Sequence, residues 1–566
     1  MYVQNDTPLG GSLALSSLVA VLPLLVLFVL LGGLRVRAWL ASLIGLAVAL
    51  LVAILAYGMP VGQALLAGTE GAAFGFFPIL WIVINALWIY QMTVSSGHFD
   101  VLRRSFGSVS DDPRVQAVII AFAFGALLEA LAGFGTPVAI CTIMLIALRF
   151  NPLKAAVVAL VANTAPVAFG AIAVPITTLA QVTGLPEAAL GAMVGRQTPI
   201  LALFVPFVLV GLVDGLKGLR ETWPVALTAG LVFGVAQFAT SNYLSLPLTD
   251  IVAALLSAGA VVLLVRIRPP RHAAVVTDAT AETREPVSVG GGGGDLGDGS
   301  GGSGPGPSGS DHDDHRLDSR RDTILAYMPY VIIIALFGIQ QIPAVSKALK
   351  AVTVKFNWPG LDVRTEAGKA VSTQAFNLNW LEAAGTILLF AGIITALVLR
   401  IRPGEAVAAY GRTLSQLRTA IPTVMAVLAL AYVMNDSGQT LTLGGLLAGT
   451  GGFFAVLSPV LGWLGTAVTG SDTSSNSLFG ALQVTAARGA GLDPVLLAAA
   501  NSSGGVLGKM ISPQNLAIAA SAVAMSGREG EILRRVLLWS LIFLVGMCVL
   551  VYLQSTPVLG WMVLAG

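Results

Sequence analysis

Charge, histidine and cysteine are all scarce in this sequence. Only 11% of the 566 residues are Asp, Glu, Lys or Arg, whereas soluble domains carry about 25%, so an ordinary soluble protein is excluded. The formal net charge of +2 leaves no basic footprint for nucleic acid. The two cysteines, Cys141 and Cys548, stand in separate apolar runs, which supports neither a disulfide framework nor a cysteine metal site. Three of the four histidines fall in or beside one polar segment, so we expect no metal ligands and no histidine-based catalytic centre inside a membrane.

Long apolar runs fill most of what remains. The mean hydropathy is +0.85, and the runs 13–34 and 38–59 each reach the roughly 20 residues that cross a bilayer. Backbone groups surrounded by lipid must be paired within their own segment, so these runs are expected to be helices. The flank before residue 13 carries no Lys or Arg, which favours an uncleaved helix over a signal peptide. We predict an all-α, multi-pass membrane protein with roughly twelve to fourteen transmembrane segments, some of them broken or hairpin-like.

One long segment interrupts the apolar pattern. Residues 278–322 are Gly, Ser, Pro and charged side chains without apolar periodicity, which is typical of a flexible linker. We therefore divide the chain into an N-terminal transmembrane half (1–270), a Gly/Ser-rich cytoplasmic linker (271–325) and a C-terminal transmembrane half (326–566).

Basic residues predict the orientation in the membrane. Clusters that begin at Arg35, Arg103, Lys217 and Arg266 fall on one side when the apolar runs are counted. The positive-inside rule assigns that side to the cytoplasm and the N-terminus to the outside. The loop 346–378 conflicts with this rule, because it carries five basic residues and the same count places it outside.

The two halves share a pattern of interruptions. The string "NTAPVAFGAIAVP" (163–175) aligns with "NSSGGVLGKMISP" (501–513) at an offset of 338, and the same offset lays "AGFGTP" (132–137) over "GSDTSS" (470–475). A shift of three further residues aligns Ser96-Gly97 with Ser437-Gly438. Corresponding broken helices in two repeats point to a transporter binding site near the middle of the bilayer. Whether the repeats are inverted is left open by the helix count.

The interruptions themselves suggest an anion site. Gly133, Gly135 and Pro137 disfavour a continuous helix, and Gly504, Gly505 and Pro513 are expected to do the same in the second repeat. A half-helix that starts at such a break directs free N–H groups and a positive dipole end at the space beside it. Small carboxylates are natural ligands there.

Four charged residues lie near these breaks: Glu129, Asp436, Asp472 and Lys509. A charge at the bilayer centre costs about 2.5–3.5 kcal/mol, so such residues usually have a task or a partner. Lys509 either holds a substrate carboxylate or pairs with Asp472 or Glu129. Asp472 either takes up a proton, since burial disfavours a carboxylate, or caps a half-helix. Glu129 is the second proton-carrier candidate, or a structural hydrogen-bond acceptor.

Hydroxyl and amide side chains at the breaks are candidates for binding a substrate, or for satisfying freed backbone groups. With Lys509, this predicted set comprises Thr136, Asn163, Thr164, Ser474, Asn476, Asn501, Ser502, Ser503 and Gln514.

Five strings in order resemble the lactate permease family of bacterial plasma-membrane proteins: "FFPILWIVINALWIYQMTVSSG", "GALLEALAGFGTPVAI", "NTAPVAFGAIAVPI", "TGSDTSSNSLFGALQ" and "NSSGGVLGKMISPQNLAIA". The resemblance implies proton-coupled import of L-lactate, D-lactate and glycolate, with no cofactor other than the coupling proton. Two departures stand out. Ala130 and Leu131 add bulk beside the first break, and Asp436 replaces a position that is commonly aromatic in the family.

Three functions remain open from the residues alone. The first is a 2-hydroxymonocarboxylate:proton symporter in which Lys509 and the half-helix ends hold the carboxylate, and Asp472 or Glu129 carries the proton. The second is a transporter of another organic anion, such as a dicarboxylate, or one driven by sodium. The third is an intramembrane hydrolase using a serine with Lys509, which the lack of a histidine base disfavours.

Overall fold

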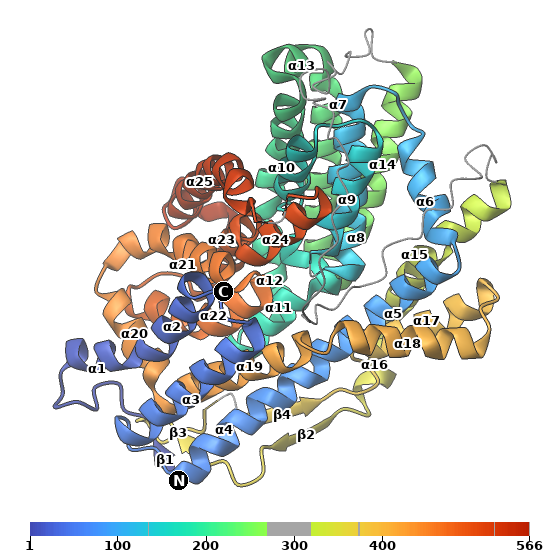
Figure 1. Cartoon of the computed structure of the whole chain (residues 1–566). Helices are drawn as coiled ribbons and strands as arrows, with labels where there is room; N and C mark the ends of the chain where they lie inside the picture. Colours follow the sequence, from blue (N-terminus) through green and yellow to red (C-terminus); the bar gives the residue numbers. More distant parts are fainter. Residues whose placement is uncertain (134, 269–318, 372–373, 526, 565–566) are drawn as a thin grey trace, which may run out of the picture.

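The computed structural model describes the chain except for residues 134, 269–318, 372–373, 526 and 565–566. Ten helical stretches in the described part are long and apolar enough to cross a membrane, or eleven if one bent pair counts as a span. Two shorter apolar helices, Thr136–Ala147 and Ala384–Val398, accompany them. The predicted all-α, multi-pass membrane fold is confirmed (Figure 1). Most of the predicted linker lies outside the described residues, and the helix that follows begins at Arg320, earlier than the expected boundary.

The elements before the linker are β1 (Tyr2–Val3), α1 (Leu13–Ala20), α2 (Leu22–Phe28), η1 (Val29–Gly33), α3 (Ala38–Leu55), α4 (Val61–Phe74), η2 (Gly75–Leu80), α5 (Trp81–Ser95), α6 (His98–Gly107), α7 (Pro113–Gln116), η3 (Ala117–Phe124), α8 (Gly125–Ala132), α9 (Thr136–Ala147), α10 (Pro152–Ala162), η4 (Val167–Phe169), α11 (Gly170–Thr183), α12 (Glu187–Val194), α13 (Thr198–Ala239), η5 (Thr240–Leu244), η6 (Leu246–Leu248) and α14 (Thr249–Ile267).

The elements after the linker are α15 (Arg320–Gln340), α16 (Pro343–Lys350), β2 (Val354–Asn357), β3 (Val363–Arg364), β4 (Ala375–Leu378), α17 (Ala384–Val398), α18 (Pro403–Gln416), α19 (Ala420–Ser437), α20 (Gln439–Ala448), η8 (Gly451–Phe453), α21 (Phe454–Thr469), α22 (Asp472–Gly489), α23 (Pro494–Gly508), η9 (Lys509–Ile511), α24 (Pro513–Ala522), α25 (Glu529–Gln554) and η10 (Gly560–Met562).

The predicted repeat is visible in the order and shape of these elements. In the first half, α5 ends at the left-handed Gly97 (φ 76°) before α6, and in the second half α19 ends at Gly438 (φ 98°) before α20. A helical hairpin follows in each half, α8–α9 with Gly135 (φ 82°) at its tip and α21–α22 with Gly470 (φ 78°). Glycine adopts this backbone conformation without strain, which explains its place at each turn. The two tip glycines, Gly135 and Gly470, are 335 positions apart, three fewer than the predicted offset of 338.

The two repeats run in opposite directions. α19 packs along α4, the helix that leads into α5, and the contacts advance along α4 as they recede along α19: a Cβ added at Gly68 would meet Val433, and one at Gly71 would meet Ala429. The helices are therefore antiparallel, and the repeats are inverted. This is the arrangement in which two repeats exchange roles between the two sides of a membrane.

Broken helices follow the hairpins, but not all breaks are where the glycines predicted them. α10 and α11 meet at an angle of 62° around η4, as expected from the first repeat. The prediction for Gly504 and Gly505 is wrong, because α23 continues to Gly508 and the chain breaks at η9. These glycines permit close packing instead: a Cβ at Gly504 would overlap Pro459 of α21. α21 and α23 are accordingly in extensive contact.

A small clasp joins the N-terminus to the long loop 346–378. β1 pairs with β3 in parallel, with Tyr2 opposite Val363 (Figure 1). The Tyr2 hydroxyl donates to the carbonyl oxygens of Tyr57 (3.1 Å) and Ser437 (2.8 Å). The N-terminus and the basic loop therefore lie on the same side, as the helix count predicted. The charge of this long loop is the weaker topology signal, because long loops cross membranes largely regardless of charge.

Candidate functional site

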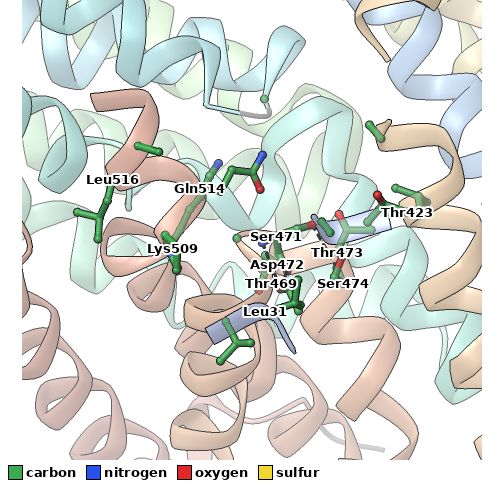
Figure 2. A pocket seen from close by; sticks show the side chains of 18 of the residues that line it. Leu31, Thr423, Thr469, Ser471, Asp472, Thr473, Ser474, Lys509, Gln514 and Leu516 are labelled. Atoms are coloured by element: carbon green, nitrogen blue, oxygen red, sulfur yellow. Dashed lines mark hydrogen bonds between the residues drawn. The ribbon is translucent and has the colours of Figure 1, made fainter. Parts of the chain in front are cut away.

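A cavity of about 800 Å³ lies where the breaks of the two repeats meet. The first repeat contributes Glu129 and Gly133 of the hairpin α8–α9 and Pro175 of α11. The second contributes the tip of α21–α22 and the segment around η9, shown in Figure 2 with Asp472, Ser474, Lys509 and Gln514 as sticks. At one end the cavity reaches Arg35 and Arg37, in a loop that the positive-inside rule assigns to the cytoplasm.

Lys509 is paired across the repeats. Its ammonium group is 2.5 Å from Glu129 Oε1, and the Asn163 amide donates to Glu129 Oε2 at 3.0 Å. Both members of the ion pair are almost fully buried, with side chains 8% and 4% exposed. Burial of either charge alone would be strongly unfavourable, so each holds the other in place. Of the two partners predicted for Lys509, the structure selects Glu129 rather than Asp472.

Asp472 lies in the first turn of α22, but it is not the helix cap. Ser471 is the cap residue, and its hydroxyl accepts from the Ser474 backbone N–H at 3.2 Å. The capping interpretation of Asp472 is therefore wrong, because the chain offers a serine one residue earlier in extended conformation.

The Asp472 carboxylate is held by donors from three segments. Oδ2 accepts from the Ser502 hydroxyl (2.6 Å) and the Asn476 amide (3.3 Å), and Oδ1 accepts from the Thr466 hydroxyl (3.5 Å). Gly505 of α23 faces the same carboxylate, and a methyl group there would overlap it. This cage positions one carboxyl group at the edge of the cavity.

The other predicted binding residues fall into two groups. Ser474 and Gln514 line the cavity with Lys509. The cavity lining found among the described residues does not include Thr136, Asn163, Thr164, Asn476, Asn501, Ser502 or Ser503. Their roles in binding substrate stay predictions.

Several of that second group support the frame of the site. Asn476 donates to the Pro175 carbonyl (3.1 Å), which ties α22 to α11 of the other repeat. Asn501 donates to Asn476 Oδ1 (2.9 Å), and the Thr164 hydroxyl donates back to the Val161 carbonyl (2.7 Å). These bonds satisfy backbone and amide groups that the breaks set free.

Sequence reasoning missed two hydroxyl groups that the start of α19 contributes to the cavity lining. Thr419 and Thr423, from the start of α19, line the cavity together with Arg35 and Arg37. No local signal marks these threonines, since they lie at the start of an ordinary apolar helix. Only the packing of α19 beside the cavity brings them to the site.

Two helix ends complete the electrostatics. The first turns of α22 (Asp472–Ser474) and α24 (Pro513–Leu516) both line the cavity, so the positive ends of two helix dipoles face it. Together with Lys509 they form a surrounding suited to one small carboxylate. Within the described ranges, no group of three or more His, Cys, Asp and Glu side chains is arranged to hold a metal ion.

The chain is similar to known proteins over nearly its whole length. A family model described as L-lactate permease matches residues 16–558. The L-lactate permease of Bacillus subtilis is 38% identical over 99% of this chain and 100% of its own length. The glycolate permease GlcA of Escherichia coli is 41% identical over 99% of both chains. Among solved structures, the YdaH transporter of Alcanivorax borkumensis is similar at a TM-score of 0.45 and 14% identity, over 88% of both chains.

Proposed function

Since the chain belongs to the L-lactate permease family, we propose that it carries lactate and the related 2-hydroxyacid glycolate across the bacterial plasma membrane by proton symport. The observation that carries this proposal is the cavity between the two inverted repeats, with one lysine and two helix N-termini directed at it. The cavity exceeds the volume of a three-carbon acid, which leaves room for water around the substrate.

Charge balance supports coupling to a proton. Apart from Arg35, Arg37 and Glu529, which are not buried, the cavity lining holds one positive group, Lys509, and two carboxyl groups, Glu129 and Asp472. If both carboxyl groups are ionised, an entering carboxylate changes the net charge around these three buried groups from −1 to −2. Two like charges about 5 Å apart repel by about 3 kcal/mol at an effective dielectric constant of about 20. A proton that arrives with the substrate removes this repulsion.

Asp472 is the better proton carrier of the two. Glu129 already neutralises Lys509 at 2.5 Å, and protonation would leave the lysine as an unpaired buried charge. Among the described residues, the hydrogen-bond donors to Asp472 are the neutral side chains of Ser502, Asn476 and Thr466, and the nearby Lys509 is paired with Glu129. Its hydroxyl neighbours can reverse their bonds when the carboxyl group gains a proton.

The transport cycle follows from the inverted repeats. The cavity reaches the loop of Arg35 and Arg37, so this conformation corresponds to access from the cytoplasm. Exchange of the two repeat conformations would close that path and open the equivalent path from the outside. Substrate and proton thus move without a continuous pore, and no cofactor beyond the proton is needed.

Counterflow in proteoliposomes tests this function. Purified protein is reconstituted into vesicles loaded with unlabelled lactate, and entry of labelled lactate is followed. Transient accumulation of the label, competed by lactate and glycolate and driven by an imposed pH gradient, is expected. Competition only by dicarboxylates, or a strict need for sodium, would establish the alternative anion transporter. Product formation without accumulation would indicate a hydrolase.

A further inference from the structure

The mouth of the cavity carries two arginines to which the transport cycle above assigns no ligand. Arg35 and Arg37 line the same cavity of about 800 Å³ as Lys509, but both are exposed. Neither guanidinium group forms an ion pair or a side-chain hydrogen bond with the part of the chain that the structure describes. Their N–H groups are therefore available to an anion that enters or leaves the cavity.

The segment that carries these arginines is short and held in place. The Val36 N–H, next to Arg35, donates to the Leu30 carbonyl at 2.8 Å. Arg37 is the residue directly before the first turn of α3. Both guanidinium groups thus extend from a fixed backbone, so little backbone freedom is lost when they bind a ligand.

The packing of α3 against α19 determines what lies beside this segment. A Cβ added at Gly45 of α3 would meet Leu430 of α19 at 3.0 Å. Further along α3, the Ala49 carbonyl accepts from the amide of Gln439, just after the end of α19. The contacts advance along both helices together, so α3 and α19 run in the same direction. Their first turns therefore lie at the same end, the mouth of the cavity.

The mouth is a different region of the cavity from the Lys509 end. Thr419 and Thr423, at the start of α19, line it together with the two arginines. Figure 2 shows Thr423 and Lys509 on opposite sides of Asp472. An anion at the mouth would consequently contact a separate set of side chains from an anion at Lys509.

One acidic group also lies at the mouth. Glu529, at the start of α25, lines the cavity and interacts favourably with the charge of Arg35, without forming an ion pair with it in the described part of the chain. Its carboxylate accepts from the Gly527 backbone N–H at 2.9 Å. Two arginines and one glutamate leave a single positive charge in excess at the mouth.

We propose that Arg35 and Arg37 form a second binding site for a small carboxylate, at the cytoplasmic mouth of the cavity. That the carboxylate is lactate rests on the proposed function. The preference for a carboxylate does not, because guanidinium groups match its two oxygens. Exposed charges bind weakly and are screened by salt, so this site holds its ligand less tightly than the buried Lys509. During import it receives the substrate on its way from Lys509 to the cytoplasm.

Chemical modification of arginine tests the site in the wild-type protein. Phenylglyoxal reacts with accessible guanidinium groups, and mass spectrometry of the peptides measures how fast each arginine is modified. We expect lactate to slow the modification of Arg35 and Arg37 in inside-out membrane vesicles. Arg266, which is exposed, is predicted on the same side and does not line the cavity, is the matched control and should react at the same rate with and without lactate. Equal rates for Arg35 and Arg37 in both conditions would overturn the proposal.

A second variant separates the mouth from the inner site. Lactate bound at Lys509 also protects the arginines if it closes the cavity, so the inner charges must be removed. In the double variant Lys509→Met with Glu129→Gln, lactate should still protect Arg35 and Arg37. Loss of protection in this variant, with the Arg266 rate unchanged, would place the carboxylate at Lys509 alone and refute the mouth site.

Glu529→Gln should strengthen the site, an effect that misfolding does not produce. The amide no longer competes for the arginines, so half-maximal protection should need about twofold to fivefold less lactate than in the wild type. Raising the salt concentration from about 0.01 M to about 1 M should abolish protection in both proteins, because the screening distance falls from about 30 Å to about 3 Å. An unchanged lactate requirement in Glu529→Gln, or protection that survives high salt, would contradict the proposal.

Lactate counterflow distinguishes failure of this site from failure of the proposed function. If the wild type moves no lactate in proteoliposomes, the proposed function fails, while protection of Arg35 and Arg37 by acetate still establishes the carboxylate site. Normal counterflow without any protection leaves the function in place and refutes the site at the mouth.

Discussion

Replacing Asp472 by asparagine separates proton coupling from substrate movement. Asparagine matches the aspartate in size, so it fits beside Gly505, where extra volume would not be accommodated. Its amide nitrogen takes the place of one carboxylate oxygen and loses at least one of the bonds from Ser502, Asn476 and Thr466. The loss costs about 1–3 kcal/mol, which leaves a folded protein.

The effect on transport is larger and specific. With one proton per lactate the transported pair is neutral, so each unit of pH difference supplies about 1.4 kcal/mol, or a roughly tenfold accumulation. An asparagine cannot take up this proton. Asp472→Asn should therefore equilibrate lactate without accumulating it, while counterflow persists at a reduced rate.

Labelled lactate uptake into proteoliposomes with an acidic exterior measures both quantities. Glu405→Gln, on the exposed face of α18, is the matched control and should accumulate lactate like the wild type. Tenfold accumulation per pH unit in Asp472→Asn would refute the reasoning and move the coupling role to another carboxyl group. Loss of counterflow together with accumulation would place Asp472 in substrate binding.

Three further predictions follow from single contacts. Lys509→Met leaves Glu129 without its ion pair and should destabilise the protein by about 3–5 kcal/mol. The double variant Lys509→Met with Glu129→Gln should recover most of the melting temperature but not lactate counterflow. Gly505→Ala places a methyl group against Asp472, so it should lower the free energy of unfolding by about 1–3 kcal/mol and also lower lactate uptake. Normal uptake in this variant would contradict the cage around that carboxylate. Burial raises the pKa of the Tyr2 phenol to about 12 from its usual value of about 10, so the clasp is intact below about pH 10 and weakens as pH rises toward 12. The protection of the backbone amides of residues 2–4 from hydrogen exchange should fall over this pH range. In Tyr2→Phe these amides should exchange rapidly at every pH.

Much of the architecture follows from local sequence signals. Apolar runs predict the helices because each must pair its backbone groups alone, and Gly97 with Gly438 marks equivalent turns because both adopt a left-handed conformation. The direction of the repeats was not predictable from these signals. It depends on the contact of α4 with α19, which brings together residues more than 350 positions apart.

The charged residues of the site were predictable from the sequence, but several of the other residues that line the cavity were not. Glu129, Asp472 and Lys509 are conspicuous because charge is costly in lipid, and all three line the cavity. Gly505 was misread as a helix breaker, since a glycine that frees the backbone and a glycine that admits a neighbour look alike in sequence.

The ion pair between Glu129 and Lys509 also has a consequence for biogenesis. The acid is made in the first half of the chain and the base in the second, so the ribosome inserts a lone carboxyl group long before its partner exists. A first half expressed alone, ending at residue 268, should be a substrate for membrane quality control. Coexpression with a fragment that begins at residue 319 should protect both fragments, because each then supplies the charge that the other lacks.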